Sequence, residues 1–344
     1  MGFTTEKTPR AGRQRRVTIV DVAAAAEVSV ASASKVVRDA PGTSPEMRRR
    51  VLEKVEELGY RPHRLAQALR APLKTIGVLV TDIENPFFTM VLKGAAEVFD
   101  AVGYDLFVSP AGLTVEAHEK AMESFVDHRM AGLLAIAPRG TDESLDNIST
   151  QVPTVVLGRH GTTTSFDTVA GNDARGAQLI VDHLVGEGHE RIAFVANVGD
   201  DNPLLPENQR LSGYRAAMTA HGLEADIVYA PWTYDGGATA ARSILDRATM
   251  PTAVATGTDV VGIRMLSELW DRGLRVPEDI ALVGYDNSPA ASFAPISLSS
   301  VDQHAFEMGR TAARLLLDRI NGRTDSRHPV LVPALVVRKS STRT

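Results

Sequence analysis

Residues 17–37 read "VTIVDVAAAAEVSVASASKVV", and this stretch decides how the N-terminal part of the chain folds. Apolar residues recur at helical spacing from Ile19 to Ala26, and Thr18 can cap that helix. Ser29 is a natural cap for a second short helix that runs to about Arg38. The second helix carries small side chains and serines, so one face can pack while the other approaches another molecule. The stretch predicts two helices joined by a tight turn.

A third helix is predicted over "SPEMRRRVLEKVEELGY", residues 44–60. Ser44 can cap it, Pro45 suits its first position, and Gly59 ends it. Its inner face consists of Met47, Val51, Val55 and Leu58. The three helices together have the organisation of a helix-turn-helix domain.

Charge is distributed unevenly along the chain. Residues 1–70 hold 14 Lys and Arg against 8 Asp and Glu, a net +6, whereas the remaining residues carry a net −11. A basic head on an acidic body fits a module that binds a polyanion, although charge alone fits a solvated terminus equally well.

The composition excludes several classes of protein. The 344 residues are 44% hydrophobic and contain no cysteine, which excludes disulfides, thiolate catalysis and cysteine-ligated zinc. No apolar run approaches the length of a membrane span, and no secretory signal is recognisable. We therefore expect a cytoplasmic protein without a membrane partner.

From Lys74 onward, β-rich runs such as "TIGVLV", "GLLAIA", "RIAFVA" and "IALVGYD" alternate with amphipathic helical segments. Buried strands that alternate with helices predict parallel sheets covered on both faces. Roughly 270 such residues exceed one typical domain, so we expect two doubly wound α/β lobes. The expected organisation is a basic disordered tail (1–16), a helix-turn-helix domain (17–60), a hinge (61–73) and a core (74–344). Within the core, one lobe is expected at 74–189 and 302–329 and the other at 190–301 and 330–344.

Seven motifs in order resemble the lactose-repressor (LacI/GalR) family of bacterial transcription regulators, and the resemblance covers nearly the whole chain from Val17. They are "TIVDVAAAAEVSVASASKVV", "PEMRRRVLEKVEELGYRPHRLAQALR", "TIGVLVTDIENPFF", "EGHERIAFV", "RLSGYRAAM", "VPEDIALVGYDN" and "SLSSVDQ". The resemblance implies an all-α headpiece and a core like a periplasmic binding protein.

The resemblance also implies a set of DNA contacts. In the headpiece these are Thr18, Ser29, Val30, Ala31, Ser32, Ser34, Lys35 and Arg38, and in the hinge His63, Arg64, Ala66, Leu69 and Arg70. Leu69 matches the leucine that wedges into the minor groove at the centre of the site. Arg64 and Arg70 are expected near phosphates, and Ala66 allows close approach to the DNA. Without the headpiece, the favoured interpretation of Leu65 and Leu69 would be an i, i+4 packing pair in a linker helix.

Several positions depart from the family pattern. Glu27 replaces a turn glycine, and a positive φ at this position would cost about 1 kcal/mol. Lys35 replaces an arginine and lacks its bidentate fork. Val30 and Ala31 can touch a thymine methyl but cannot hydrogen-bond a base edge, so DNA deformation should carry more of the discrimination. His63 replaces the hinge asparagine.

In the core, the resemblance implies an effector site between the lobes, formed by Phe87, Phe88, Arg210, Trp232, Asp259 and Asp286. An aromatic face with a carboxylate and a guanidinium suits a sugar. Thr258 precedes Asp259 where the family has asparagine, so the polar pattern of the ligand should differ. Taken alone, Trp232 and Asp286 fit a packing residue and a strand-end cap.

These features predict a sequence-specific regulator, most simply a repressor, whose binding to a pseudo-palindromic operator is controlled by a carbohydrate. The expected assembly is a homodimer or a tetramer. No catalytic motif, metal ligand set or cofactor fingerprint was found, so we expect neither an enzyme nor a bound cofactor. The alternatives are a cytoplasmic sugar-binding protein and a regulator without an effector.

Overall fold

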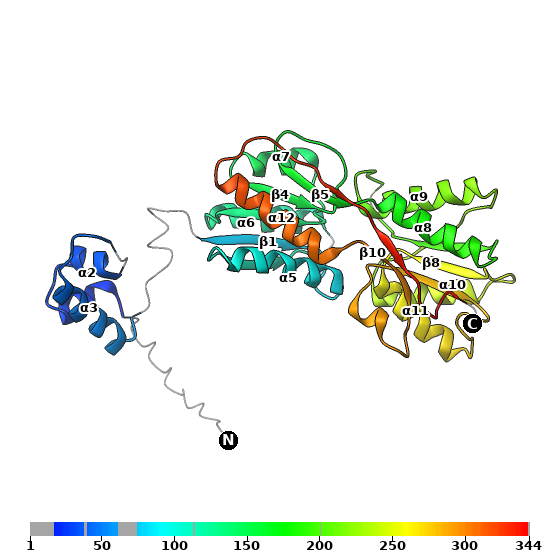
Figure 1. Ribbon diagram of the computed structural model, residues 1–344, viewed down its shortest axis with the longest axis horizontal. Helices are drawn as coiled ribbons and strands as arrows, with labels where there is room; N and C mark the ends of the chain where they lie inside the picture. The colour runs from blue at the N-terminus through cyan, green and yellow to red at the C-terminus, as the bar shows by residue number, and fades with distance from the viewer. Residues whose placement is uncertain (1–16, 38–39, 61–73, 113, 200, 343–344) are drawn as a thin grey trace, which may run out of the picture. The chain divides into compact units, whose positions relative to one another are not determined.

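The computed structural model describes residues 17–37, 40–60, 74–112, 114–199 and 201–342 (Figure 1). The chain separates into two compact units, Met1–Leu73 and Lys74–Thr344. The expected tail, Arg38 and the hinge residues His63, Arg64, Ala66, Leu69 and Arg70 lie outside the described residues.

The first unit contains the three predicted helices, α1 (Ile19–Ala25), α2 (Val30–Val37) and α3 (Pro45–Glu57). Thr18 and Asp21 form a reciprocal capping box at the start of α1, and the Ser44 hydroxyl accepts from the Met47 amide at the start of α3. The helices pack around a small core of Val22, Ala23, Ala26, Ala33, Val36 and Val51.

The turn before α2 passes through Glu27, which has a φ of 54°. This left-handed conformation favours glycine, which is the residue that the family pattern has at this position. The Glu27 side chain is exposed, so the cost falls on the backbone rather than on packing.

The second unit contains two lobes, and each is a sheet with helices on both faces. The first sheet has the strand order β11-β5-β4-β3-β1-β2, with every pairing parallel. Apolar clusters around Val78 and Leu79 fill the two faces of this sheet, because successive strand residues point to opposite sides. The elements of this lobe are β1 (Thr75–Val80), α5 (Pro86–Asp100), β2 (Asp105–Pro110), α6 (Val115–Asp127), β3 (Gly132–Ile136), α7 (Asp142–Ser149), β4 (Thr154–Leu157), β5 (Asp167–Gly171), α12 (Ala305–Ile320) and β11 (Val330–Leu331).

The second sheet has the order β12-β10-β9-β8-β6-β7, in which only the β10–β12 pair is antiparallel among the described strands. Phe194 and Val195 lie in the apolar clusters on its two faces. The elements of this lobe are α8 (Asp173–Gly186), β6 (Ile192–Ala196), α9 (Pro206–Ala220), β7 (Asp226–Tyr229), α10 (Tyr234–Leu245), β8 (Ala253–Thr256), α11 (Asp259–Asp271), β9 (Ala281–Tyr285), the 3₁₀ turn η1 (Pro289–Ser292), β10 (Ser299–Asp302) and β12 (Ala334–Val336). The predicted pair of doubly wound lobes is thus present.

The first crossing between the lobes differs from the expectation. It was expected near Glu190, but α8 packs on the second sheet, with Ile180 and Leu184 in the same cluster as Phe194. The chain therefore crosses between β5 and α8, at residue 172. The second crossing lies between β10 and α12, and the third between β11 and β12, where the C-terminal segment, red in Figure 1, runs from one lobe to the other.

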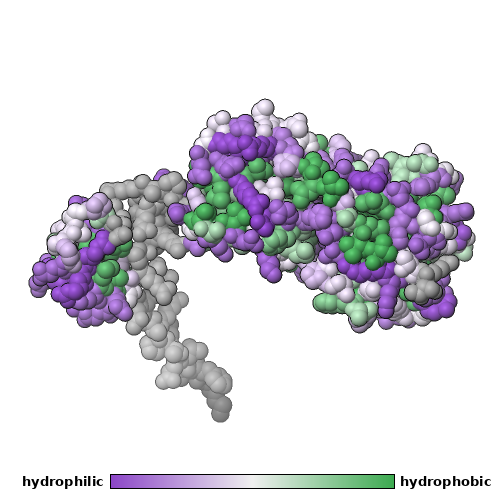
Figure 2. All heavy atoms as spheres, viewed as in Figure 1, coloured by the Kyte–Doolittle hydropathy of each residue, from purple (hydrophilic) through white to green (hydrophobic). Residues whose placement is uncertain are grey.

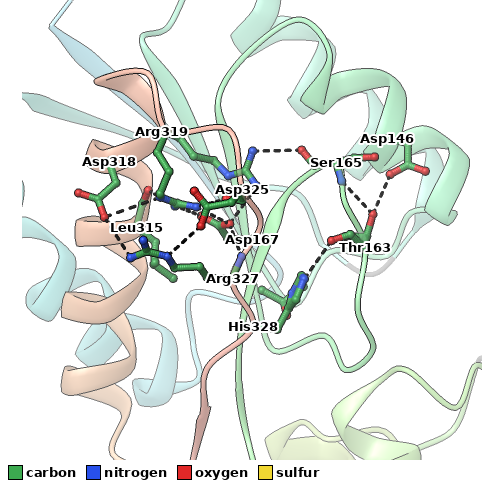
Figure 3. Close-up of polar contacts among 12 residues, drawn as sticks. Asp146, Thr163, Ser165, Asp167, Leu315, Asp318, Arg319, Asp325, Arg327 and His328 are labelled. Atoms are coloured by element: carbon green, nitrogen blue, oxygen red, sulfur yellow. Dashed lines mark hydrogen bonds and ion pairs between the residues drawn. The ribbon is translucent and has the colours of Figure 1, made fainter.

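An ion-pair cluster fastens this C-terminal segment to the first lobe (Figure 3). The buried Asp167, at the start of β5, accepts hydrogen bonds from the Arg319 and Arg323 guanidiniums and from the Arg327 amide. His328 contacts the hydroxyl of Thr168 at 2.9 Å. Burial alone would raise the pKa of Asp167, but the two arginines outweigh it and hold the pKa below its usual value.

None of the helices in the described ranges is long and apolar enough to cross a membrane.

Candidate functional site

A cavity of about 530 Å³ lies between the two lobes of the second unit. Five of the six predicted effector residues line it: Phe87, Phe88, Arg210, Trp232 and Asp286. They come from both lobes and lie at the carboxyl ends of strands or the starts of the following helices, where ligands bind in doubly wound folds.

Phe87 and Phe88 form an apolar wall contributed by the first lobe. They occupy the first turn of α5, whose start is fixed by Pro86 and by the Asn85 side chain, which accepts from the Phe87 amide at 2.9 Å. The two rings meet edge to face with centroids 5.5 Å apart. Both side chains are largely buried, and both line the cavity.

Arg210 is held by three hydrogen bonds. Its Nε donates to Asp173 Oδ1 at 2.7 Å, its Nη1 to the Gly257 carbonyl at 2.7 Å, and its Nη2 to Gln303 Oε1 at 3.4 Å. The guanidinium carbon lies 3.8 Å from the centroid of the Tyr285 ring. Arg210 thus contacts residues at the first crossing (Asp173) and the second crossing (Gln303) at once.

Asp173 links the lobes directly. It is the first residue of α8, in the second lobe, and its Oδ2 lies 2.7 Å from Nε2 of His160, which follows β4 in the first lobe. Burial alone would raise the pKa of Asp173, but Arg210 and His160 outweigh it and lower the pKa below its ordinary value. The carboxylate therefore stays ionised between its two partners.

Asp286 follows β9 and adopts the left-handed conformation, with a φ of 117°. Its Oδ1 accepts from Gln303 Nε2 at 2.6 Å and its Oδ2 from Asn85 Nδ2 at 3.4 Å. Burial raises the pKa of Asp286 to about 8, with Arg210 acting against this shift and Asp259 adding to it. The site therefore keeps a protonatable carboxyl at the point where Asn85 of the first lobe meets the second.

Trp232 lies beside Arg210, whose guanidinium carbon is 5.3 Å from its ring centroid. The indole Nε1 donates to the Val195 carbonyl at 3.2 Å. A Cβ at residue 257 would come within 1.9 Å of the indole, so Gly257 is needed for the ring to lie in this position.

Asp259 is the predicted residue that the structure places elsewhere. It does not line the cavity but is buried at the start of α11, where its Oδ1 accepts from the Ser300 hydroxyl at 2.6 Å and its Oδ2 from the Ser288 amide at 2.6 Å. Both oxygens are engaged in joining α11 to neighbouring loops. Its neighbour Thr258 does line the cavity and caps α11.

The cavity residues that were not predicted from the sequence include Asn85, Asp173, Arg139 and Glu207. Arg139 of the first lobe and Glu207 of the second form an ion pair across the cavity, with Nη2 and Oε1 3.1 Å apart. Asn85 could have been found from the Asn-Pro pair that begins α5. The other three depend on contacts between residues that are distant in sequence.

In the first unit, the predicted DNA-contacting residues of α2 lie on one surface. Val30, Ala31 and Lys35 are exposed, whereas the opposite face is buried. The hydroxyls of Ser29 and Ser32 lie 2.9 Å apart, and the Ser29 hydroxyl accepts from the Ser32 amide. Ser34 is half-buried, and the Thr18 hydroxyl is directed to Asp21. Figure 2 shows this unit with a predominantly hydrophilic visible face.

No group of three or more acidic or histidine side chains in the described ranges has a geometry that could hold a metal ion.

Comparisons with known proteins agree with both parts of this arrangement. Residues 18–63 match the family described as bacterial regulatory proteins, lacI family, and residues 181–341 match the periplasmic binding protein-like domain. The chain is 34% identical to the HTH-type transcriptional regulator CelR of Thermobifida fusca, over 95% of this chain and 99% of the relative. The solved complex of transcriptional regulator CelR with cellobiose has a TM-score of 0.70 and 32% identity, covering 94% of this chain and 100% of that one. The lac repressor dimer bound to operator and the anti-inducer ONPF has a TM-score of 0.79 and 26% identity, covering 96% and 100%.

Proposed function

The chain belongs to the LacI family of bacterial regulatory proteins, and from this membership we propose that it is a transcriptional repressor whose operator binding is controlled by a small molecule in the interlobe cavity. The headpiece recognises the operator, and the two-lobed core binds the effector. Such a regulator acts in the cytoplasm, on chromosomal DNA. The relatives are regulators rather than enzymes, and we propose no catalytic role for the core.

The observation that carries the proposal is the position of Arg210. This side chain faces the cavity and hydrogen-bonds residues at two of the crossings between the lobes. A ligand that shifts Arg210 therefore changes the constraints on both connections, and one that shifts Asp286 changes the contact with Gln303 at the second crossing. An effector can switch the protein only if its affinity differs between two lobe arrangements, and we propose that the contacts of Arg210 are the source of this difference.

On the DNA side, a homodimer places two copies of α2 in successive major grooves of a pseudo-palindromic site. Lys35 and the serines of α2 contact phosphates or base edges, while Val30 and Ala31 contact thymine methyl groups. Leu69 from each subunit opens the minor groove at the centre of the site. Because α2 offers few base-edge donors, the deformability of the central base pairs contributes much of the specificity.

Asp286→Ala tests the role of the cavity. An operator is first selected from genomic DNA, and a panel of sugars is then screened for release of the complex. The variant should bind the operator with wild-type affinity but lose the response to the effector that releases the wild type, because its carboxyl is removed without any change to the headpiece. Fluorescence anisotropy on labelled operator measures both quantities. A wild-type response in the variant would show that the effector acts elsewhere.

A further inference from the structure

His118 is a fully buried histidine of the first lobe that has no part in the function proposed above. It lies on α6, and both of its ring nitrogens contact backbone groups. Nε2 lies 2.8 Å from the Gly112 carbonyl oxygen, and Nδ1 accepts from the Arg139 amide at 3.0 Å. The ring thus links two segments of backbone that are distant in the chain.

These two contacts require one form of the imidazole. The Arg139 amide can only donate and the Gly112 carbonyl can only accept, so Nδ1 is unprotonated and Nε2 carries the hydrogen. A doubly protonated ring would lose its acceptor for the amide and would be repelled by the Arg139 guanidinium. Burial lowers the pKa of His118, the Gly112 carbonyl opposes this shift, and the charge of Arg139 adds to it. The histidine is therefore neutral where it joins the two segments.

The two segments form part of the cavity wall. Gly112 follows β2 and Arg139 follows β3, and both residues line the cavity. In the sheet, β2 and β3 lie on opposite sides of β1, which pairs with both. The two loops therefore leave strands that are not hydrogen-bonded to each other, and the His118 ring supplies a bridge between them.

Arg139 is the member of this wall that reaches the second lobe. Its Nη2 lies 3.1 Å from Oε1 of Glu207, and the two side chains are 17% and 14% exposed. Its Nε is buried and has no hydrogen-bond partner among the described residues. An ion pair with so little solvent around it is favourable only when its geometry is fixed, because the cost of desolvating both charges must be offset. The backbone position of Arg139 therefore decides whether this pair between the lobes forms.

We propose that His118 is a positioning residue of the cavity: as the neutral imidazole it holds Gly112 and Arg139 together and so aligns the Arg139 guanidinium with Glu207 of the second lobe. An imidazole suits this role, because one rigid ring presents both a donor and an acceptor. This inference deepens the proposed function, since both charged residues line the cavity assigned to the effector. Its test needs neither operator nor effector, so operator selection tests the proposed function separately.

Two substitutions in the full-length protein separate the two contacts of the ring. His118→Asn keeps an acceptor near the position of Nδ1, whereas His118→Gln keeps a donor near the position of Nε2. Each is combined with Glu207→Gln, and urea unfolding is followed by tryptophan fluorescence. In the wild type, Glu207→Gln should lower the urea midpoint, because it leaves the Arg139 guanidinium buried without a carboxylate. That decrease should persist in the His118→Asn background and fall below half its size in the His118→Gln background.

Glu268→Gln is the matched control, because this glutamate pairs with Arg242 and Arg264 and does not line the cavity. It should change the urea midpoint equally in all three backgrounds. An equal effect of Glu207→Gln in the wild type and in His118→Gln would overturn the inference, since His118 would then act only by filling space. A wild type whose midpoint does not respond to Glu207→Gln would overturn it as well.

Hydrogen exchange of the wild type adds a measurement that requires no variant to fold. The Arg139 amide should be protected as strongly as the amides of β3, because its acceptor is a buried ring. Exchange of this amide at the rate of an exposed loop would contradict the role given to His118.

Discussion

Glu27 lies in the turn between α1 and α2 and has a φ of 54°. This backbone conformation costs an L-residue about 1 kcal/mol relative to glycine. The side chain is exposed, so its loss removes no packing. Replacing it should therefore change the stability of the headpiece through the backbone alone.

Glu27→Gly should stabilise the headpiece by about 1 kcal/mol, measured as slower amide hydrogen exchange in α1 and α2 of the full-length protein. Glu27→Ala is the control, because alanine carries the same Cβ and suffers the same strain. If alanine stabilises the headpiece as much as glycine does, the gain comes from lost charge and the strain argument is wrong.

Asp286 should make the stability of the core depend on pH. Burial, together with Asp259 and against the effect of Arg210, raises its pKa to about 8 in the folded protein, above an ordinary value of 3.8. Below about pH 4 both the folded and unfolded forms hold the proton. As the pH rises from 4 to 8 the unfolded form loses it while the folded form retains it, so the stability contributed by this group falls across that window.

The free energy of unfolding of the wild type should therefore decrease relative to that of Asp286→Asn as the pH rises from 5 to 8. Urea unfolding followed by tryptophan fluorescence reports the core alone, because both tryptophans, Trp232 and Trp270, lie in it. Parallel curves for the two proteins would show that Asp286 does not hold its proton in the folded state.

At the scale of elements, α8 packs closely against α9 within the second lobe. Gly213 of α9 faces α8 so closely that a Cβ would lie 2.2 Å from the Ala174 carbonyl oxygen and 2.6 Å from its Cα. These are backbone atoms, which cannot rotate away. The two helices can approach this closely only because residue 213 lacks a side chain.

Gly213→Ala should destabilise the core by about 1–3 kcal/mol, measured by the same fluorescence-detected urea unfolding. Gly186→Ala, at the end of α8, is the matched control: nothing lies within 4 Å of its added Cβ, so alanine should be neutral or stabilising. A similar decrease in the free energy of unfolding in both variants would mean that α8 and α9 do not approach closely at Gly213.

The sequence pattern predicted the helices and strands whose apolar residues follow a clear period, and it failed where an element contains buried polar residues or where its lobe had to be chosen. Strands such as β1 and β9 are unbroken apolar runs and were recognised directly. Strands β5 and β10 include polar residues such as Asp167 and Ser299, whose hydrogen bonds come from distant segments, and were not recognised. Helix α8 was expected in the wrong lobe because its amphipathic pattern does not specify which sheet it covers.

The same distinction applies to the site. Arg210 and Asp286 belong to recognisable motifs, and the cavity contains both. Asp173 lies in none of the quoted motifs, and Gln303 ends the motif "SLSSVDQ" but was not predicted as a site residue. They reach Arg210 from 37 and 93 residues away in the chain, and only the fold brings them together.

At the scale of the whole molecule, the charge is divided between the two units. The head, residues 1–70, carries a net +6 and the rest a net −11. Contacts between basic residues and phosphates release counterions, so the affinity for DNA should fall as salt increases, while the acidic core adds no attraction to DNA.

The central claim is that the headpiece recognises a particular duplex sequence. Selection of genomic DNA by the purified full-length protein, repeated at 50 and 200 mM salt, tests it most directly. The account predicts a pseudo-palindromic site bound at least about 10³-fold more tightly than random DNA, with both affinities weaker at the higher salt. Equal affinity for selected and random duplexes at both salt concentrations would contradict it.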